Sequence, residues 1–492
     1  VTVPPHHDIM GAIGAAIIAQ ERAHADEFDE TGFRGFDLRG VDYELKTFEC
    51  KSCSNRCEIH RVSIEGRKPL HYGSRCGKFD DEAGKKGAGL PTPFHDREEF
   101  LMGAYGRDEP DQPIGVKIGI PRALTFFDLY PLWKAFFTEL GCEVELSEAT
   151  NAHIAHAGAE AMTTETCFPV VVSHGHVLDL ADSDVDYIFL PSVINLEHEA
   201  TDAVHSFACP LAQSLPYLVD AAIDMDSKRP QMLAPTFHFE RGRKAVEDAL
   251  RDLGKMLDVP SGRVQKAIEA GWQALDSFRE MCRRRGAEIM DSLDPEQRAV
   301  VVVSRPYIGW DPGMNLAIPE KLRDLGVVAV PIDFLPLEME AVGEDYPHMY
   351  WKYGQKIIAA ARYVAERPNL HAVYITNFRC GPDSFITKFF DRELGEPYLT
   401  IEVDAHSADV GAITRCEAFI DSFPNITGGR TRVSRGEDLH FNVHSSDKPV
   451  KLYIPHMCDH GRVMAASFRA GGVDAEAMPM SDSRSVELGR KF

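Results

Sequence analysis

Four cysteines near the amino end of the sequence have a spacing typical of a metal site. Cys50, Cys53, Cys57 and Cys76 form a CxxCxxxC motif followed by a fourth cysteine beyond a hairpin-like segment. Four thiolates held on turns and a hairpin suit a tetrahedral Zn²⁺ or a [4Fe–4S] cubane. The spacing therefore predicts a metal centre, with iron, zinc and free thiols as the open alternatives.

Three further cysteines are dispersed, and each directly precedes an expected helix. They are Cys167 in ETCFP, Cys209 in FACP and Cys380 in NFRCGPD. A helix N-terminus lowers the pKa of a thiol and favours the metal-binding thiolate. If two α/β blocks face each other, the three thiols meet in the cleft and hold a cubane with one iron open to a ligand. The alternative is three buried structural cysteines.

Polar residues accompany two of these cysteines. Glu165, His174 and His176 lie near Cys167 and are candidate catalytic residues. A spacing of two does not place both histidines on one helix face, so we expect one to point at the cleft. Near the third cysteine, Asp383 is interpreted either as a hydrogen-bonding neighbour of cluster sulfides or as a helix N-cap. Asn377 and Ser384 are candidates for the first of these roles.

The remaining cysteines are assigned no chemistry. Cys142, Cys282 and Cys416 are interpreted as structural thiols, and no role is assigned to Cys458. Eleven cysteines without other signs of secretion indicate a reducing cytoplasm rather than a disulfide framework.

Alternating strands and helices must position these residues. Apolar strands alternate with helical patterns, which predicts parallel sheets with right-handed crossovers in two blocks. A helical stretch, Glu240 to Leu293, separates the blocks. The expected strands are Val116–Ile120, Cys142–Leu146, Asp186–Leu190, Val300–Val303, Val327–Val330, Ala372–Ile375 and Tyr398–Ile401.

The amino-terminal part has a different pattern. Residues 11–24 read as one helix rich in small residues, whose GAIGAA segment indicates close helix packing or a phosphate-facing helix start. Residues 43–79 read as short strands around cysteines, with a turn at Glu65–Gly66 and with His60 and His71 as solvated hairpin residues. Residues 80–115 are rich in Gly, Pro and charge, which indicates a domain boundary.

A repeat runs through the sequence. The segment from Val116 resembles the segment from Val300, and a third copy begins at Val450. An isolated βαβ start does not bury a core of its own. We therefore expect the natural protein to continue beyond Phe492, and we expect the segment that starts at Val1 to be preceded by more chain.

Composition excludes several classes of protein. The 492 residues carry 53 Lys and Arg against 76 Asp and Glu, a formal net charge of −23. Such an acidic chain is a poor candidate for binding nucleic acid or an anionic membrane surface. No apolar run reaches about 18 residues, so no transmembrane helix is expected.

A family resemblance follows from the motifs. In order, IGIPRAL, ETCFP, HGHV, DYIFLPS, CP, SRPY, DPGMN, NFRCGPDSF and EVDAHSADVGAITRCEAF lie between Ile118 and Phe423. This stretch resembles the large activase-related proteins of the 2-hydroxyacyl-CoA dehydratase and benzoyl-CoA reductase system. The opening PPHHDIMGAIGAAIIA resembles the end of their actin-like ATPase domain, and the repeat at Val450 resembles the start of a further dehydratase-like module.

The resemblance implies a redox function. It implies ATP-coupled, low-potential electron transfer through iron–sulfur clusters to a dehydratase or reductase, with ATP bound in an upstream domain. Cys167, Cys209 and Cys380 fall where the family binds its cluster. Implied partners are ferredoxin or flavodoxin, the upstream ATPase domain, a downstream dehydratase-like module, an acyl-CoA substrate and a second copy of the chain.

Some positions depart from the family pattern and keep alternatives open. Val171, Ser304, Ile308, Leu316 and Ala405 stand where polar residues or glycine are common in the family. One alternative is a double-cubane type reductase of small molecules. The other is a non-catalytic scaffold or regulator with a structural zinc ribbon.

The expected fold class is α/β, with two Rossmann-like parallel-sheet blocks facing a cleft and a small cysteine-rich β ribbon. The expected segments are an ATPase-domain tail (1–30), the metal-binding ribbon (31–95), the first block (114–239), a helical connector (240–296), the second block (297–425) and a truncated further α/β module (449–492).

Overall fold

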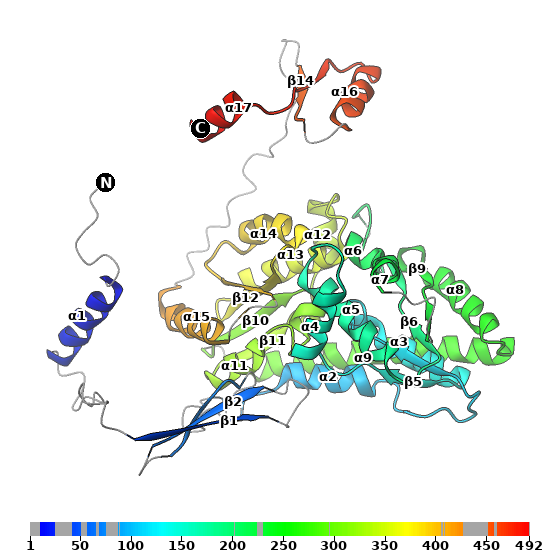
Figure 1. Ribbon diagram of the computed structural model, residues 1–492, viewed down its shortest axis with the longest axis horizontal. Helices are drawn as coiled ribbons and strands as arrows, with labels where there is room; N and C mark the ends of the chain where they lie inside the picture. Colours follow the sequence, from blue (N-terminus) through cyan, green and yellow to red (C-terminus); the bar gives the residue numbers. More distant parts are fainter. Residues whose placement is uncertain are drawn as a thin grey trace. The chain divides into compact units, whose positions relative to one another are not determined.

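The structure is a computed structural model, and Figure 1 traces its elements along the chain. It describes residues 10–24, 42–50, 57–64, 68–74, 87, 89–200, 202–223, 230–294, 296–404, 407, 409–426, 451–456 and 460–491. The chain divides into two compact units, residues 1–430 and 431–492, and each is considered by itself.

The first block is built on a four-stranded parallel sheet, drawn from cyan to green in Figure 1. Strand β4 (Lys117–Ile120) pairs with β5 (Glu143–Leu146) on one side and with β6 (Tyr187–Phe189) on the other. Beyond β6 lies β8 (Gln231–Leu233). This order, second-first-third-fourth, is that of doubly wound domains, which bind ligands beyond the carboxyl ends of their strands.

The second block repeats this topology. Strand β10 (Ala299–Ser304) lies between β11 (Val328–Pro331) and β12 (Leu370–Asn377), and β13 (Leu399–Val403) follows at the edge. All three pairings are parallel, and every residue of β10 and β12 is buried. The α/β fold class with parallel sheets is therefore confirmed, and the same strand order in both blocks matches the repeat in the sequence.

Helices and short strands complete the two blocks. The first block also holds a two-stranded parallel sheet that the sequence patterns did not predict, made of β7 (Ser192–Asn195) and β9 (Thr236–His238). The helices of the two blocks are α3 (Phe126–Leu140), α4 (Ala152–Ala161), α5 (Phe168–Ala181), α6 (Pro210–Gln213), α7 (Leu215–Ala222), α10 (Pro306–Gly309), α11 (Ile318–Asp324), α12 (Met339–Asp345), α13 (Lys352–Ala365), α14 (Gly381–Leu394) and α15 (Asp409–Ser422).

Helix α3 carries much of the core of the first block. Leu132, Trp133, Phe136 and Phe137 recur at helical spacing, and all are buried. The helix ends at Gly141, whose φ of 94° lies in the left-handed region and whose N–H donates to the Phe137 carbonyl. The predicted glycine cap is confirmed, and it turns the chain directly into β5.

The connector between the blocks is helical, as the sequence predicts. Helix α8 (Arg243–Met256) is followed by α9 (Ser261–Ser292), a single helix of 32 residues. Helix α9 packs along α3 and also against the short 3₁₀ turn Ile332–Phe334 of the second block. It thus contacts both blocks and holds them together.

The interpretation of residues 80–115 as a boundary is wrong for its central part. Helix α2 (Pro93–Gly103) packs against α3, α9 and β11. Its buried face includes Arg97, which is 2% exposed and pairs with Asp333. A charged residue at a buried position hides the apolar periodicity from which a core helix is normally predicted.

The amino-terminal ribbon is a three-stranded antiparallel sheet. Strands β1 (Tyr43–Glu49), β2 (Glu58–Ile64) and β3 (Leu70–Tyr72) pair in sequence order. The predicted turn at Glu65–Gly66 lies outside the described residues. Helix α1 (Met10–His24) forms as expected, and a Cβ on Gly11 or Gly14 would meet nothing within 4 Å.

The second unit is a small βαβ element. Strand β14 (Leu452–Ile454) pairs in parallel with β15 (Ala475–Ala477) across helix α16 (His460–Ala470), and α17 (Ser483–Lys491) follows. The third repeat therefore begins with the expected strand, helix and strand.

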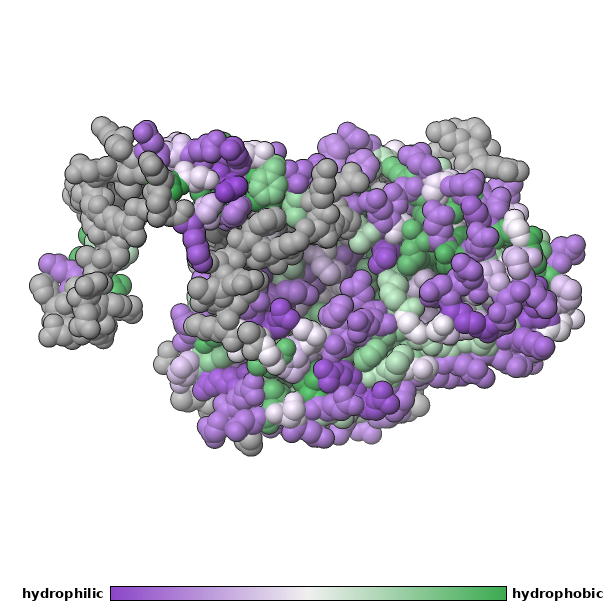
Figure 2. All heavy atoms as spheres, turned by 90° about the horizontal axis from the view of Figure 1, so that it is seen from below, coloured by the Kyte–Doolittle hydropathy of each residue, from purple (hydrophilic) through white to green (hydrophobic). Residues whose placement is uncertain are grey.

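Within the described parts of the chain, no helix has the length and apolar character needed to cross a membrane. The face drawn in Figure 2 is largely hydrophilic, with smaller hydrophobic areas between.

Candidate functional site

All three dispersed cysteines lie at helix starts, as the sequence predicts. Cys167 is the N-cap of α5, Cys209 the N-cap of α6 and Cys380 the N-cap of α14. A proline within the first two positions of each helix sets the helical backbone directly after the cysteine. The first two cysteines belong to the first block and Cys380 to the second, so the site draws on both.

The three thiols are electrostatic neighbours, but the lowered pKa predicted for Cys167 and Cys380 is wrong. Burial raises the pKa of Cys167, and the nearby Cys209 raises it further. Burial raises the pKa of Cys380 to about 12, with smaller contributions from Asp383 and Cys167. Desolvation of a thiolate here outweighs the helix N-terminus, which acts only over the first turn. Among the described residues, no three His, Cys, Asp or Glu side chains are arranged around a single metal ion.

A buried ion pair lies beside Cys380. Arg305 Nε donates to Asp383 Oδ1 at 2.6 Å, and the hydroxyl of Thr376 donates to Asp383 Oδ2 at 2.6 Å. Arg305 and Asp383 are each about 1% exposed. The N-cap interpretation of Asp383 is thus wrong. Cys380 is the N-cap of α14, and the Asp383 carboxylate accepts a hydrogen bond from Arg305.

The guanidinium of Arg305 is only partly satisfied. Its Nη2 is buried and has no hydrogen-bond partner in the part of the chain that the structure describes. The hydroxyl of Tyr374 is buried and unpartnered in the same sense. Arg305 directly follows β10, and Cys380 lies shortly after β12, so both occupy the carboxyl edge where the strand order reverses.

Glu165 and the residue before Cys380 join the two cysteine loops. Arg379 Nη2 lies 2.7 Å from Glu165 Oε2, and both side chains are exposed. Arg379 has a φ of 68°, in the left-handed region that non-glycine residues rarely adopt. Of the other residues flanking Cys380, Asn377 donates to the Phe378 carbonyl and Ser384 to the Cys380 carbonyl.

The two histidines of α5 are both fully buried and differ in their partners. His174 Nδ1 lies 2.8 Å from the Val170 carbonyl, and its Nε2 is buried without a partner among the described residues. His176 Nδ1 lies 2.9 Å from Ser147 Oγ, and its Nε2 lies 3.0 Å from Thr150 Oγ1. Burial lowers the pKa of His176 to about 3, with a smaller effect from Arg122, so its ring is neutral.

His176 belongs to a chain of hydrogen bonds that crosses between the blocks. Ser147 Oγ accepts from the Arg122 backbone N–H, which leaves its own proton for His176 Nδ1. His176 Nε2–H then donates to Thr150, whose hydroxyl donates to Asp311 Oδ2. The tautomer is assigned from this network. Sequence reasoning missed Thr150 and Asp311, although Asp311 opens the DPGMN motif.

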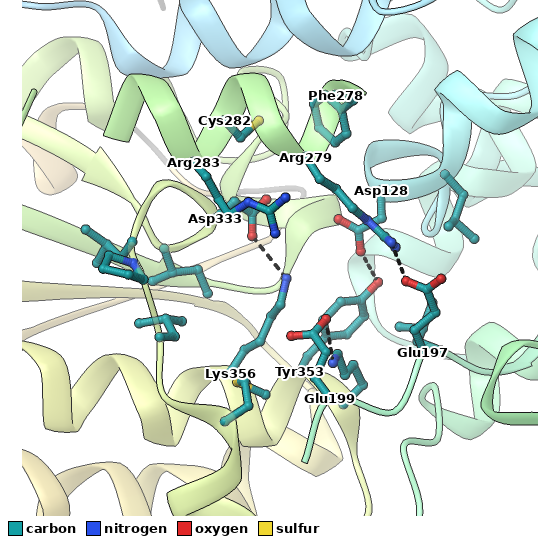
Figure 3. Close-up of a pocket in the computed structure, with 18 residues that line it drawn as sticks. Asp128, Glu197, Glu199, Phe278, Arg279, Cys282, Arg283, Asp333, Tyr353 and Lys356 are labelled. Atoms are coloured by element: carbon teal, nitrogen blue, oxygen red, sulfur yellow. Dashed lines mark hydrogen bonds and ion pairs between the residues drawn. The ribbon is translucent and has the colours of Figure 1, made fainter. Parts of the chain in front are cut away.

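A pocket of about 370 Å³ was also missed by sequence reasoning (Figure 3). Lys352 Nζ lies 2.8 Å from Glu199, and Lys356 Nζ lies 3.5 Å from Asp333. Arg279 pairs with Glu197 at the same pocket. These charges come from elements distant in the sequence, which explains why no local motif marks them.

Burial and pairing shift the ionisation of the groups in this pocket. Burial lowers the pKa of Lys352 to about 8 against the opposing charge of Glu199. Burial opposes ionisation of Glu199, but Lys352 and Lys356 outweigh it and lower the pKa of Glu199 to about 2. Burial and the charge of Asp333 raise the pKa of Asp128, which accepts a hydrogen bond from the Tyr353 hydroxyl.

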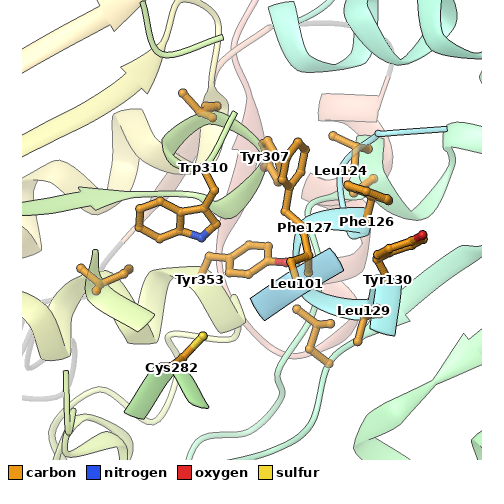
Figure 4. Close-up of a cluster of buried hydrophobic side chains, with 14 of the residues drawn as sticks. Leu101, Leu124, Phe126, Phe127, Leu129, Tyr130, Cys282, Tyr307, Trp310 and Tyr353 are labelled. Atoms are coloured by element: carbon orange, nitrogen blue, oxygen red, sulfur yellow. The ribbon is translucent and has the colours of Figure 1, made fainter. Parts of the chain in front are cut away.

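A cluster of buried apolar side chains includes Tyr353, which also lines this pocket. The cluster in Figure 4 includes Leu101, Phe127, Tyr307, Trp310 and Tyr353. Burial raises the pKa of Tyr307, and electrostatic interactions with Cys380 and Cys209 raise it further. Cys380 is buried, whereas Cys167 and Cys209 are half-buried.

The amino-terminal cysteines are described only in part. Cys50 directly follows β1, and Cys57 directly precedes its paired strand β2. The Cys50 N–H donates to the Cys57 carbonyl at 2.8 Å. Cys53 and Cys76 lie outside the described residues, so the four-cysteine site stays a prediction.

The structure agrees with the sequence interpretation of His60 and of three further cysteines. His60 stacks on Tyr72 and contacts Thr47 on the ribbon, in keeping with a hairpin position. The structural role of Cys142, Cys282 and Cys416 is supported, because all three are buried. Cys458 lies outside the described residues.

Comparison with protein families places the central part of the chain. Residues 117–335 match the family described as the CoA enzyme activase uncharacterised domain. This segment belongs to that domain family. The match of this segment agrees with the resemblance of the motifs to CoA-enzyme-activase-related proteins. The matched segment contains Cys167, Cys209, both histidines of α5 and Asp311.

The solved structures matched by the chain have low sequence identity to it. No curated protein matches the chain. A variant of the Mn-bound periplasmic metal-binding protein of Candidatus Liberibacter asiaticus is 9% identical, with a TM-score of 0.18, over 63% of this chain and 100% of that one. The C-terminal domain of glucosamine-fructose-6-phosphate aminotransferase from Francisella tularensis is 11% identical, with a TM-score of 0.16, over 69% and 97%. The cobalamin-dependent S-adenosylmethionine radical enzyme OxsB is 12% identical, with a TM-score of 0.19, over 84% and 67%.

Proposed function

We propose that the activase-related chain is an iron–sulfur redox protein whose cleft cluster is held by Cys167, Cys209 and Cys380. The observation that carries the proposal is the arrangement of these thiols, which start three helices of two blocks. Cys209 lies close enough to raise the pKa of Cys167, and Cys167 lies close enough to raise that of Cys380. Three ligands of a cubane bind three different iron atoms. They therefore stand farther apart than ligands around one ion, which is compatible with the absence of a single-ion arrangement among the described residues.

The surroundings of the thiols fit an anionic group. Arg305 is buried beside Cys380 and keeps one guanidinium nitrogen without a partner among the described residues. A buried N–H donor without a partner is costly, and cluster sulfides or cysteine sulfurs are acceptors that would satisfy it. The positive charge of Arg305 also partly offsets the burial that raises the pKa of Cys380.

The chain's own residues would position and shield the group. When bound, a cluster supplies one-electron transfer at low potential. Asp383 and Thr376 fix the orientation of Arg305, and the Glu165–Arg379 ion pair joins the loops that carry Cys167 and Cys380. Tyr307 and its apolar neighbours exclude water.

The family relationship suggests the wider setting. We infer that the chain works with a CoA-dependent dehydratase-like enzyme, coupled to ATP through an upstream domain and supplied by ferredoxin or flavodoxin, in the cytoplasm and as a homodimer. A second centre at Cys50, Cys53, Cys57 and Cys76 would relay electrons as a cubane or stabilise the ribbon as zinc.

Metal and acid-labile sulfide content of anaerobically purified protein, with electron paramagnetic resonance before and after dithionite, tests the proposal. About eight iron per chain indicates two cubanes, and about four iron with one zinc indicates a cleft cluster above a structural ribbon. Zinc without iron contradicts the cleft cluster and supports the scaffold alternative.

A matched pair of variants locates the cluster. Cys380→Ser should lose the cleft iron, whereas Cys142→Ser should keep it, because Cys142 is a buried thiol in the core between α3 and β5. Full iron content in Cys380→Ser would overturn the assignment.

A further inference from the structure

A second pocket, of about 270 Å³, lies where α2, the loop after β4, the loop after β5 and the segment after β10 meet. None of the cysteines lines it, so it is separate from the proposed cluster site. Its volume is slightly below the range typical of pockets for drug-sized ligands, which suits one small molecule. The apolar part of its wall includes Phe94, Phe126, Phe127 and Trp310, with Leu101 and Met102.

Aromatic and aliphatic side chains make most of this wall apolar. Phe94 and Trp310 lie with ring centroids 5.4 Å apart, and Phe126 and Phe127 meet edge to face at 5.2 Å. Figure 4 shows Phe126, Phe127 and Trp310 among the buried hydrophobic side chains. Such a wall accommodates an apolar side chain and fixes its position through ring contacts.

One end of the pocket carries a positive charge that is held in place. Arg122 donates from Nε to the Ser147 carbonyl at 3.1 Å, and its guanidinium lies over the Phe126 ring. Its Nη1 lies 3.9 Å from Glu98, which is longer than a hydrogen bond. The two outer nitrogen atoms of Arg122 can therefore donate hydrogen bonds to a ligand carboxylate in the forked geometry that guanidinium groups favour.

The pocket also holds a carboxylate that is rigidly oriented. Asp311 Oδ1 accepts the Gly313 N–H at 2.9 Å, and Oδ2 accepts the Thr150 hydroxyl. A Cβ on Gly313 would come within 2.2 Å of the Thr150 carbonyl, so the two segments meet at backbone contact. Each carboxylate oxygen keeps a further acceptor position, which a ligand ammonium group can use.

We propose that this pocket binds an α-amino acid with an apolar side chain. The ligand carboxylate pairs with Arg122, its ammonium group pairs with Asp311, assisted by Glu98 at the rim, and its side chain packs against Phe94, Phe126 and Trp310. The pocket thus offers complementary charges for both ends of a zwitterion and an apolar wall for the rest. A ligand with only one of these charges leaves the opposite partially buried charge unpaired, which such sites reject strongly.

Calorimetry on the full chain with L-phenylalanine and L-leucine tests the proposal. Matched probes are 3-phenylpropionate, which lacks the ammonium group, and 2-phenylethylamine, which lacks the carboxylate. We expect both to bind at least about tenfold more weakly than L-phenylalanine. Failure of both amino acids to bind at millimolar concentrations, or equal binding of 3-phenylpropionate, would overturn the proposal.

Variants assign binding to this pocket. Asp311→Asn removes the negative charge and keeps an oxygen for Thr150 or Gly313, and Arg122→Gln removes the cation. Each should weaken L-phenylalanine binding about tenfold or more, whereas Arg279→Gln, at the pocket of Figure 3, should not. Unchanged affinity in both pocket variants would contradict the assignment.

Fluorescence provides a readout that does not depend on those variants folding. Ligand binding should change the emission of Trp310, and this change should disappear in Trp310→Phe and persist in Trp272→Phe. A change that persists in Trp310→Phe would place the ligand elsewhere.

Discussion

Arg379 pairs with Glu165 across the two blocks while its own backbone adopts a φ of 68° immediately before Cys380. The ion pair is exposed, so it contributes little to stability, whereas the left-handed backbone is unfavourable for any side chain with a Cβ. The chain therefore keeps a strained residue at the position that orients one cysteine. Such strain is concentrated at functional sites in proteins generally.

This strain predicts opposite effects for two substitutions of Arg379. Arg379→Gly should leave the free energy of unfolding unchanged or raise it by about 1 kcal/mol, because glycine adopts a positive φ readily. Arg379→Val should lower it by more than about 1 kcal/mol, because a β-branched residue is poorly tolerated there. Urea unfolding of the two variants measures the difference. Equal stability of the two would contradict the strained backbone.

Close backbone contact between α4 and α5 predicts a severe effect at Gly175. A Cβ on Gly175 would come within 1.9 Å of the Ile154 carbonyl. Gly175→Ala should force the helices apart, displace His176 and cost about 2–4 kcal/mol of stability, as overpacking does when backbone must move. Chemical unfolding measures this cost.

The matched control is Gly262→Ala, at the exposed start of α9. A Cβ there would meet nothing within 4 Å. Its greater helix propensity should raise the stability by up to about 1 kcal/mol. A loss at Gly262 similar to that at Gly175 would show that the contact is not the cause.

The buried pair beside Cys380 predicts a large loss when one partner is removed. Asp383→Ala would leave Arg305 as an uncompensated buried charge and should cost about 3–5 kcal/mol. Glu280→Ala removes the partner of Arg283 in a surface pair with both side chains more than 60% exposed, and it should cost less than about 1 kcal/mol. Thermal or urea unfolding distinguishes the two, and similar small effects would rule out a buried charge at Arg305.

The ionisation of Asp311 predicts a dependence of stability on pH. Burial raises the pKa of Asp311 to about 6, against the hydrogen bond from Thr150. Its pKa in an unfolded chain is about 3.9. The folded state therefore binds the proton more tightly than the unfolded state. The resulting increase in the free energy of unfolding is lost as pH rises from about 4 to 6.

A comparison of the wild type with Asp311→Asn isolates this effect, since His176 titrates in both proteins. The stability of the wild type relative to Asp311→Asn should fall by about 2 kcal/mol between pH 4 and pH 7. Urea unfolding at the two pH values measures it. A difference that is constant, or that grows with pH, would contradict the raised pKa.

Local patterns in the sequence determined much of the fold. The alternation of strands and helices predicted both parallel sheets. Local residue patterns predicted the helix cap at Gly141 and the helix starts at Cys167, Cys209 and Cys380. These features depend on periodicity, turn residues and prolines within a few positions, so the sequence contains them directly.

The tertiary structure alone decided which charges are buried together. Arg97 and Asp333 are 236 positions apart, and Thr150 and Asp311 are 161 apart, so no spacing rule links them. Burial also raised the pKa of Cys380, where the sequence predicted a lowered one. The effect of a helix N-terminus depends on a few neighbours in sequence, whereas desolvation depends on every group packed around the thiol. Local propensity can be read from neighbours in sequence, whereas ionisation and pockets follow from neighbours in space.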